Sequence, residues 1–294
     1  NDTNSYPDIL PKRAFSDQLR FVFVMGLEGT GHHMWLPIWT DCQNKSNCDC
    51  APQIEDFTFG ADQMRSGMFG AFTGKREVEQ YVERVISQLP SKLAEDQKAR
   101  GSDQSVTYLL NTLCVKHKHY WSVGAMSYPN FMNGCRSWSN PDVRLMAEVF
   151  ESLGIDFRVM VVVRDALDVL LSTTVHRHFG RFEPTGHTYA SIVNSAMVDS
   201  QLARLDPTFF KCLEYEKFPA VPEGMGSFLN VDHSDWTFAD TLPKFYHNVA
   251  RAKGAITQHD KALNKLNNLP NRKKSYEDLN QALKRLRKIC GLDQ

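Results

Sequence analysis

Three features are missing from this sequence, and each absence excludes a class of protein. No apolar run approaches the ~20 residues that a membrane-spanning helix needs. A net charge is missing as well, because 34 Lys and Arg balance 34 Asp and Glu, whereas proteins that bind nucleic-acid phosphates usually carry a basic excess. Internal repeats and low-complexity tracts are also absent. With 42% hydrophobic and 23% charged residues, the chain has the composition of a globular protein, and we expect no nucleic acid among its partners.

Cysteine usage indicates an oxidising compartment. The chain has seven cysteines, of which Cys42, Cys48 and Cys50 crowd one polar stretch. Their spacing is poor for zinc without a following Cys or His pair, so we interpret the stretch as a disulfide loop, with free thiols or a metal as the alternatives. The N-x-[ST] sequons at Asn1 and Asn44 add slight support for a glycoprotein. We therefore expect a secretory-pathway location, in the Golgi lumen, with a membrane anchor outside this chain.

Apolar runs of strand length alternate with helical patterns along most of the chain. Residues 1–20 are polar and indicate an N-terminal arm, and residues 21–294 then form a single domain. Because strand and helix alternate, we predict an α/β fold, a three-layer sandwich with a central, mostly parallel sheet. The expected strands cover 21–25, 106–115, 157–163 and 209–215, and the expected helices lie at 75–99, at 142–153 and in the last fifty residues, with a basic stretch at 272–288.

A glycine-rich turn, Gly26-Leu27-Glu28-Gly29-Thr30-Gly31, follows the first expected strand. Its glycines have the Walker A spacing, but His32 and His33 stand where Lys and Ser or Thr would be. Glycines let successive backbone N–H groups point at an anion, and the start of the next helix adds a positive field. The turn therefore predicts a phosphate site in a P-loop-containing nucleotide-binding fold. The missing Lys and hydroxyl weaken the case for ATP with magnesium, and the alternative is a tight turn that binds nothing.

A second candidate site begins where the strand over 157–163 ends. Arg164 follows this strand, and Ser172 comes eight residues later, in a helix that Asp165 can cap. An Arg at the carboxyl end of a parallel strand lies at the crevice where α/β folds bind ligands, and Ser172 can face the same crevice. The alternative is an ion pair between Arg164 and Asp168, with Ser172 merely packed.

Together these two sites resemble the sulfotransferases that use 3′-phosphoadenosine 5′-phosphosulfate (PAPS). In that family a strand–loop–helix binds the 5′-phosphosulfate, which implies this role for Leu27–His33. A later Arg with a Ser eight residues on grips the 3′-phosphate, which implies that role for Arg164 and Ser172. The segment Leu213–Phe218 is similar to the Tyr-Glu-Asp strand end of the family, and this similarity places Tyr215 near the adenine. The resemblance spans roughly residues 21–218. It implies metal-free transfer of a sulfuryl group to a hydroxyl, with 3′-phosphoadenosine 5′-phosphate as the product.

The sequence departs from the family at a charge that takes part in the reaction. The family's loop usually carries Lys or Arg where this chain has Gly29, so the cation at the leaving oxygen must come from elsewhere. His32 and His33 are the first candidates, because a protonated imidazole is a cationic donor. Lys116 and Lys118 are the others.

Transfer to a hydroxyl also needs a general base near the acceptor. His117 is the first choice and His119 the second, because both end an expected strand and resemble the segment where cytosolic members of the family place their catalytic His. Glu55 and Asp56 remain alternatives, since some relatives use a carboxylate. The lumenal setting favours a carbohydrate or peptide acceptor. Two rival functions are a P-loop nucleotide-dependent kinase and a non-catalytic nucleotide-binding relative.

Overall fold

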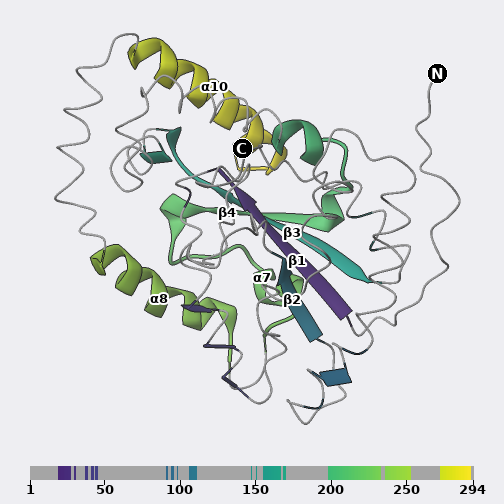
Figure 1. Ribbon diagram of the computed structural model, residues 1–294. Coiled ribbons are helices and arrows are strands. Elements are labelled where there is room, and N and C mark those ends of the chain that lie inside the picture. The colour runs from purple at the N-terminus through teal and green to yellow at the C-terminus, as the bar shows by residue number, and fades with distance from the viewer. Residues whose placement is uncertain are drawn as a thin grey trace, which may run out of the picture.

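The fold is described from a computed structural model of the protein (Figure 1). Its sheet is built from β1 (Leu19–Gly26), β2 (Val106–Leu110), β3 (Asp156–Val163) and β4 (Phe210–Glu214). The helices are α7 (Met225–Leu229), α8 (Phe238–Ala252) and α10 (Arg272–Ile289), with 3-10 turns η3 (Pro207–Phe209) and η4 (Tyr215–Lys217) on either side of β4. The structure describes residues 19–27, 30, 37–38, 41–42, 44–45, 91, 94–95, 98, 106–110, 147, 150, 155–166, 168–169, 198–232, 236–252 and 272–292.

All four strands run parallel, in the order β2-β1-β3-β4. Each lies within or close to a run that the sequence assigned to a strand, so the predicted α/β class with a parallel sheet is confirmed. Two boundaries differ from the expectation. β1 begins at Leu19, inside the predicted arm, because Arg20 donates a hydrogen bond of 2.7 Å from Nε to Oδ2 of Asp156 on β3. In addition, α7 begins at Met225, in a stretch for which the sequence predicted neither a strand nor a helix.

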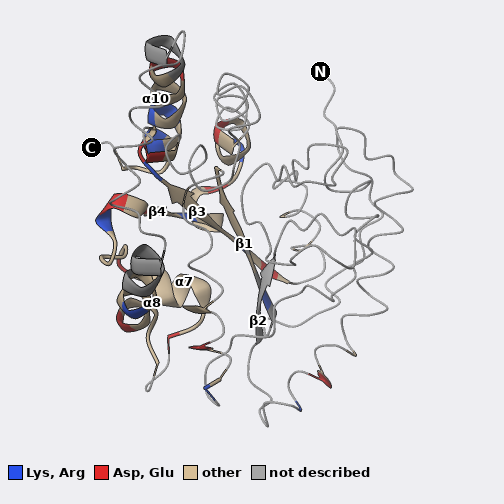
Figure 2. Cartoon of the chain, turned by 60° about the vertical axis from the view of Figure 1, so that its left-hand side comes forward, with Lys and Arg blue, Asp and Glu red and all other residues tan. Residues whose placement is uncertain are grey.

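Helices lie on both faces of the sheet. Side chains alternate between the two faces along each strand, so both faces carry apolar side chains that the helices cover. One face carries a core cluster in which β1 and β3 residues pack with α7, α8 and the segment that follows β1. Figures 1 and 2 show α10 on the side of the sheet away from α7 and α8. The members of the cluster are Val22, Val24, Ile38, Cys42, Met160, Val162, Leu213, Phe218, Met225, Leu229, Val231, Trp236, Phe238 and Leu242.

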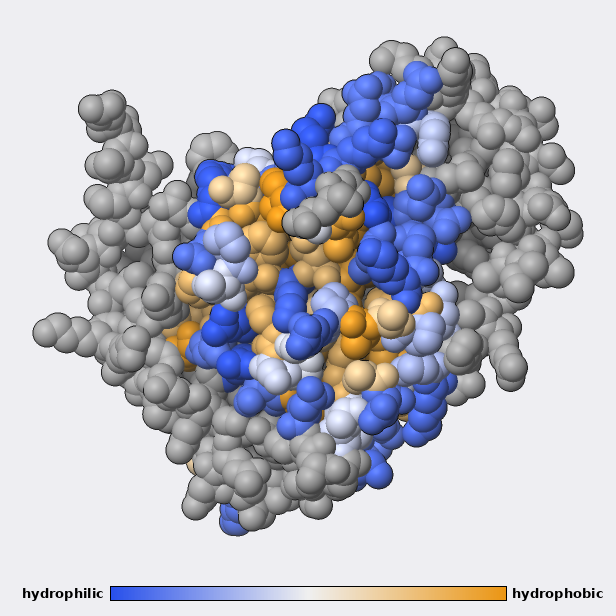
Figure 3. Space-filling model, turned by 180° about the vertical axis from the view of Figure 1, so that it is seen from behind, coloured by the Kyte–Doolittle hydropathy of each residue, from blue (hydrophilic) through white to orange (hydrophobic). Residues whose placement is uncertain are grey.

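The helix α10 is amphipathic, as its sequence predicts. Leu279, Leu283 and Leu286 recur at helical spacing and are buried, whereas Lys284 and Arg285 on the opposite side are exposed. Figure 2 shows the basic residues along this helix. Seen from behind, in Figure 3, apolar residues gather near the centre of the visible face and hydrophilic residues lie around them. Because Leu279, Leu283 and Leu286 are buried, the apolar side of α10 faces the sheet.

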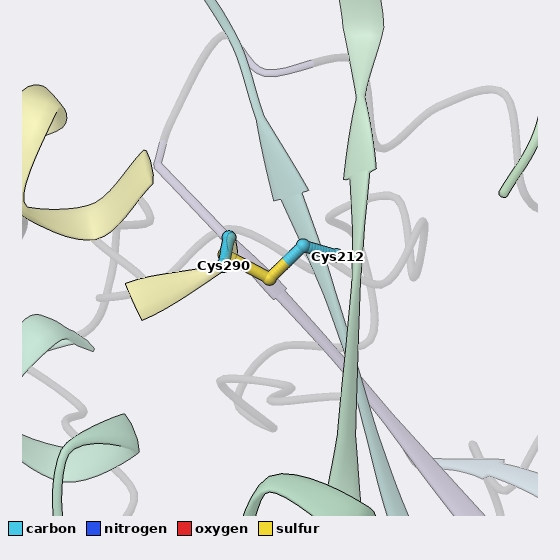
Figure 4. Close-up of a disulfide and its surroundings, with 2 residues drawn as sticks. All are labelled: Cys212 and Cys290. Atoms are coloured by element: carbon cyan, nitrogen blue, oxygen red, sulfur yellow. A yellow bond between two sulfur atoms is a disulfide. The ribbon is translucent and has the colours of Figure 1, made fainter. Parts of the chain in front are cut away.

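Two contacts fasten α10 to β4. A disulfide joins Cys212 to Cys290 across 78 residues of sequence (Figure 4), and the Arg287 guanidinium pairs with the Glu214 carboxylate. Cys212 and Glu214 lie two apart on a strand, while Arg287 and Cys290 lie three apart at the end of a helix, so each pair points the same way. The disulfide and the ion pair therefore hold one end of α10 against the strand that leads to η4.

Candidate functional site

The site lies where the chain leaves β1 and β3 in opposite directions. After β1 the chain passes to the α8 face, where Ile38 and Cys42 join the core cluster. After β3 it passes to the α10 face, since Asp199, which precedes β4, lies 3.6 Å from Arg285 of α10. In an open α/β sheet, such a divergence between neighbouring strands leaves a crevice outside their carboxyl ends, and ligands bind there. In the described strand order the carboxyl ends of β1 and β3 are neighbours, so a crevice of this kind would lie beside Gly26 and Arg164.

The turn after β1 is tight because of one glycine and one hydroxyl. The Thr30 hydroxyl is buried and donates to the Leu27 carbonyl at 2.7 Å, and the Thr30 N–H donates to the same carbonyl at 3.1 Å. A Cβ on Gly26 would lie 2.6 Å from the Thr30 Oγ1 and 3.0 Å from the Val162 carbonyl oxygen on β3. Only glycine fits there without displacing a neighbour, so the turn starts in close contact with β3.

Arg164 and Tyr215 come together at the ends of the adjacent strands β3 and β4. The Arg164 guanidinium carbon lies 4.1 Å from the centre of the Tyr215 ring, a cation–π contact. The Tyr215 ring in turn packs edge-on against Phe218 and Tyr246, at 5.3 and 5.7 Å between ring centres. The ion pair that was the alternative reading is present too, with 3.8 Å between Arg164 Nη2 and Asp168 Oδ2. An aromatic platform with one guanidinium beside it suits a ligand that carries a ring and an anion.

The helix after β3 begins as the sequence predicted. Asp165 caps it, since the Asp168 N–H donates to the Asp165 carboxylate at 3.4 Å and the Val169 N–H to the Asp165 carbonyl at 2.9 Å. The Asp165 N–H itself donates to Glu216 of η4 at 2.6 Å. This contact ties the end of β4 to the start of the helix and fixes Arg164 between them.

Two ionisable groups of the site have shifted pKa values. Burial raises the pKa of Tyr215 above its ordinary 10.0, although nearby Arg164 opposes the shift, so the phenol stays protonated at neutral pH and can donate. Burial also raises the pKa of Glu214, but hydrogen bonds from Lys217 and Arg287 outweigh burial and leave the net pKa lowered. Glu214 is therefore an anion at neutral pH, at the last position of β4.

The structure places four of the predicted site residues. It brings Arg164 and Tyr215 into contact, and it puts Leu27 and Thr30 in the turn that follows β1, next to the end of β3. It also shows Cys42 in a disulfide, whereas the pairing within the predicted disulfide loop stays a prediction. The other candidates lie outside the described residues: Glu28, Gly29, Gly31, His32, His33, Cys48, Cys50, Glu55, Asp56, Lys116, His117, Lys118, His119 and Ser172.

Sequence reasoning missed the aromatic side chain that packs behind Tyr215, that of Tyr246. Tyr246 comes from α8, more than thirty residues after Tyr215, and no local pattern links the two. The pairing of Cys212 with Cys290 was missed as well. Cys212 and Glu214 point the same way on a strand, as do Arg287 and Cys290 at the end of α10, but no local pattern in the sequence fixes this pairing.

Comparison with known proteins adds no relative. No protein family matches the chain, and no curated protein matches it. Among the described residues, no group of His, Cys, Asp and Glu is arranged to hold a metal ion. Within the same part of the chain, every helix is too short or too polar to cross a membrane.

Proposed function

We propose that the protein is a PAPS-dependent sulfotransferase that acts on a carbohydrate or peptide hydroxyl in the lumen of the secretory pathway. The observation that carries the proposal is the meeting of the β1 turn and Arg164 at neighbouring carboxyl ends, where the strand order opens a crevice. The resemblance of both segments to that family supports the choice of ligand. The P-loop-type fold is part of the same proposal.

Each part of the donor has an assigned partner in this proposal. Backbone N–H groups of Leu27–His33 hold the phosphosulfate, Arg164 and Ser172 hold the 3′-phosphate, and Tyr215 lies against the adenine. The contact of Arg164 with the Tyr215 ring supports a ligand that presents a phosphate and a base to the same place.

The reaction needs no metal in this scheme. The sulfur–oxygen bond to the donor phosphate breaks as the acceptor oxygen bonds to sulfur, and the acceptor proton passes to a base, for which His117 is the first candidate and His119 the second. His32 or His33 neutralises the charge that develops on the departing phosphate. The product nucleotide is 3′-phosphoadenosine 5′-phosphate.

Calorimetry with three nucleotides tests the donor. We expect 3′-phosphoadenosine 5′-phosphate to bind more tightly than ADP or ATP with magnesium, because Arg164 is matched to the 3′-phosphate. Arg164→Ala then weakens this binding about 30-fold or more, the loss of a charged hydrogen bond worth about 2 kcal/mol. Arg204→Ala is the control, since Arg204 is exposed and its guanidinium donates hydrogen bonds to Ser200 of its own segment. A preference for ATP with magnesium would instead favour the kinase.

Transfer of labelled sulfate from PAPS separates an enzyme from a binding protein. Glycans and peptides with free hydroxyls serve as acceptors, and the His117→Ala and His119→Ala variants identify the base. If nucleotide binding is tight but no acceptor becomes labelled, the chain is a non-catalytic relative. If His32→Ala and His33→Ala retain full activity, the compensating cation lies elsewhere.

A further inference from the structure

The turn at Asn44 and Lys45 is exposed, whereas Asp41 and Cys42, which precede it, are held by contacts with the rest of the protein. Asp41 accepts a hydrogen bond from the Trp236 indole at 3.0 Å and lies 3.6 Å from Lys244 of α8. Cys42 is fully buried in the core cluster on the α8 face of the sheet and takes part in a disulfide. These contacts hold Asp41 and Cys42 in place shortly before Asn44.

Asn44 lies at the exposed tip of this turn. The Lys45 N–H donates to the Cys42 carbonyl at 2.9 Å, which closes a four-residue β-turn with Asn44 at its third position. Asn44 and Lys45 are both exposed. A large group on the Asn44 side chain would therefore extend into solvent without displacing the buried Cys42.

The chemistry of this turn matches one modification. Asn44-Lys45-Ser46 is an N-x-Ser sequon whose middle residue is not proline. Among the described residues, the disulfide between Cys212 and Cys290 and the bonded state of Cys42 both belong to an oxidising compartment, and that is also where N-glycans are added. Sequon, exposure and compartment thus agree at a single residue.

We propose that Asn44 is an N-glycosylation site. A lipid-linked oligosaccharide diphosphate is the donor: a bond forms between Asn44 Nδ2 and the anomeric carbon, and the bond from that carbon to the diphosphate oxygen breaks. The diphosphate leaves with the electron pair, and the amide nitrogen loses one proton. The proposal shares only the lumenal setting with the proposed function and requires no bound nucleotide.

The test expresses the full chain behind a secretory leader in eukaryotic cells, in a Thr3→Ala background that removes the sequon at Asn1. An amidase that releases N-glycans converts each glycosylated Asn to Asp, and peptide mass spectrometry in heavy-oxygen water then locates the site. We expect most copies to carry one glycan at Asn44. Asn44→Gln and Ser46→Ala lose it entirely, and Ser46→Thr keeps it, because threonine preserves the sequon.

Two results would overturn the proposal. One is an unmodified peptide over Asn44 in secreted protein that contains the Cys212–Cys290 disulfide. The other is a glycan mass that persists in both Asn44→Gln and Ser46→Ala. Neither readout involves sulfate transfer, so failure of the proposed function would leave the result at Asn44 unchanged, and the reverse also holds.

Discussion

The disulfide between Cys212 and Cys290 allows a quantitative prediction about stability. It closes a loop of 78 residues. In the chain-entropy description, a loop of this length destabilises the unfolded state by about 4.5 kcal/mol. For a domain of this size, that corresponds to a loss of roughly 7 °C in Tm when the bond is absent.

The assay must separate this bond from every other disulfide of the chain, including the one at Cys42. Urea unfolding is therefore followed with and without reductant, in the wild type and in Cys212→Ala/Cys290→Ala. Reductant breaks the Cys42 bond in both proteins, so the extra loss in the wild type is the contribution of Cys212–Cys290. We expect about 4 kcal/mol for this difference in the free energy of unfolding.

A difference below about 1 kcal/mol would refute the loop-closure reasoning. Such a small difference would have one of two causes. Either α10 stays on β4 without the bond, or the unfolded chain is already restricted without it. Hydrogen exchange in α10 distinguishes these cases, because the helix should exchange faster after reduction if the disulfide, and not contacts such as Arg287–Glu214 and Arg285–Asp199, holds it on β4.

Three further predictions concern the sheet and its edges. Gly26→Ala should lower stability by about 1–3 kcal/mol and weaken nucleotide binding, because the new Cβ meets the Thr30 hydroxyl; chemical denaturation and calorimetry measure both, and unchanged values would contradict the tight turn. The lowered pKa of Glu214 stabilises the fold above its unfolded value near 4.5, and this stability is lost as pH falls through the folded value; Glu214→Gln should flatten that part of the acid-unfolding curve, and an identical slope would refute it. Arg20→Met should cost about 2 kcal/mol and speed hydrogen exchange in α7, because Arg20 bonds to Asp156 and to two carbonyls at the end of that helix, whereas the exposed control Arg204→Met should change neither.

The two inner strands could be predicted from the sequence because each contains an apolar run, and in β3 this run is buried on both faces. The apolar run of β3, residues 159–163, is followed by the charged Arg164, and the apolar run of β1, residues 21–25, is followed by Gly26. Where a strand uses a polar contact, the pattern failed: Leu19 and Arg20 belong to β1 because Arg20 reaches Asp156, and this partner cannot be read from local sequence.

The candidate site could be predicted only in part, for the same reason. That Arg164 and Tyr215 both end strands follows from the sequence, whereas their contact depends on β3 and β4 being neighbours. The disulfide partner of Cys212 was beyond local reasoning, because 78 residues separate the two sulfur-bearing positions and spacing alone does not fix a pairing.

The strand order also governs how the protein is made. β1 is an inner strand, yet its partner β3 is synthesised later by 136 residues, the separation of Arg20 and Asp156. At usual rates of translation, roughly 10 s pass before β3 emerges. During that interval the apolar β1 has at least one unpaired edge, so we expect the nascent chain to depend on chaperones until β3 docks.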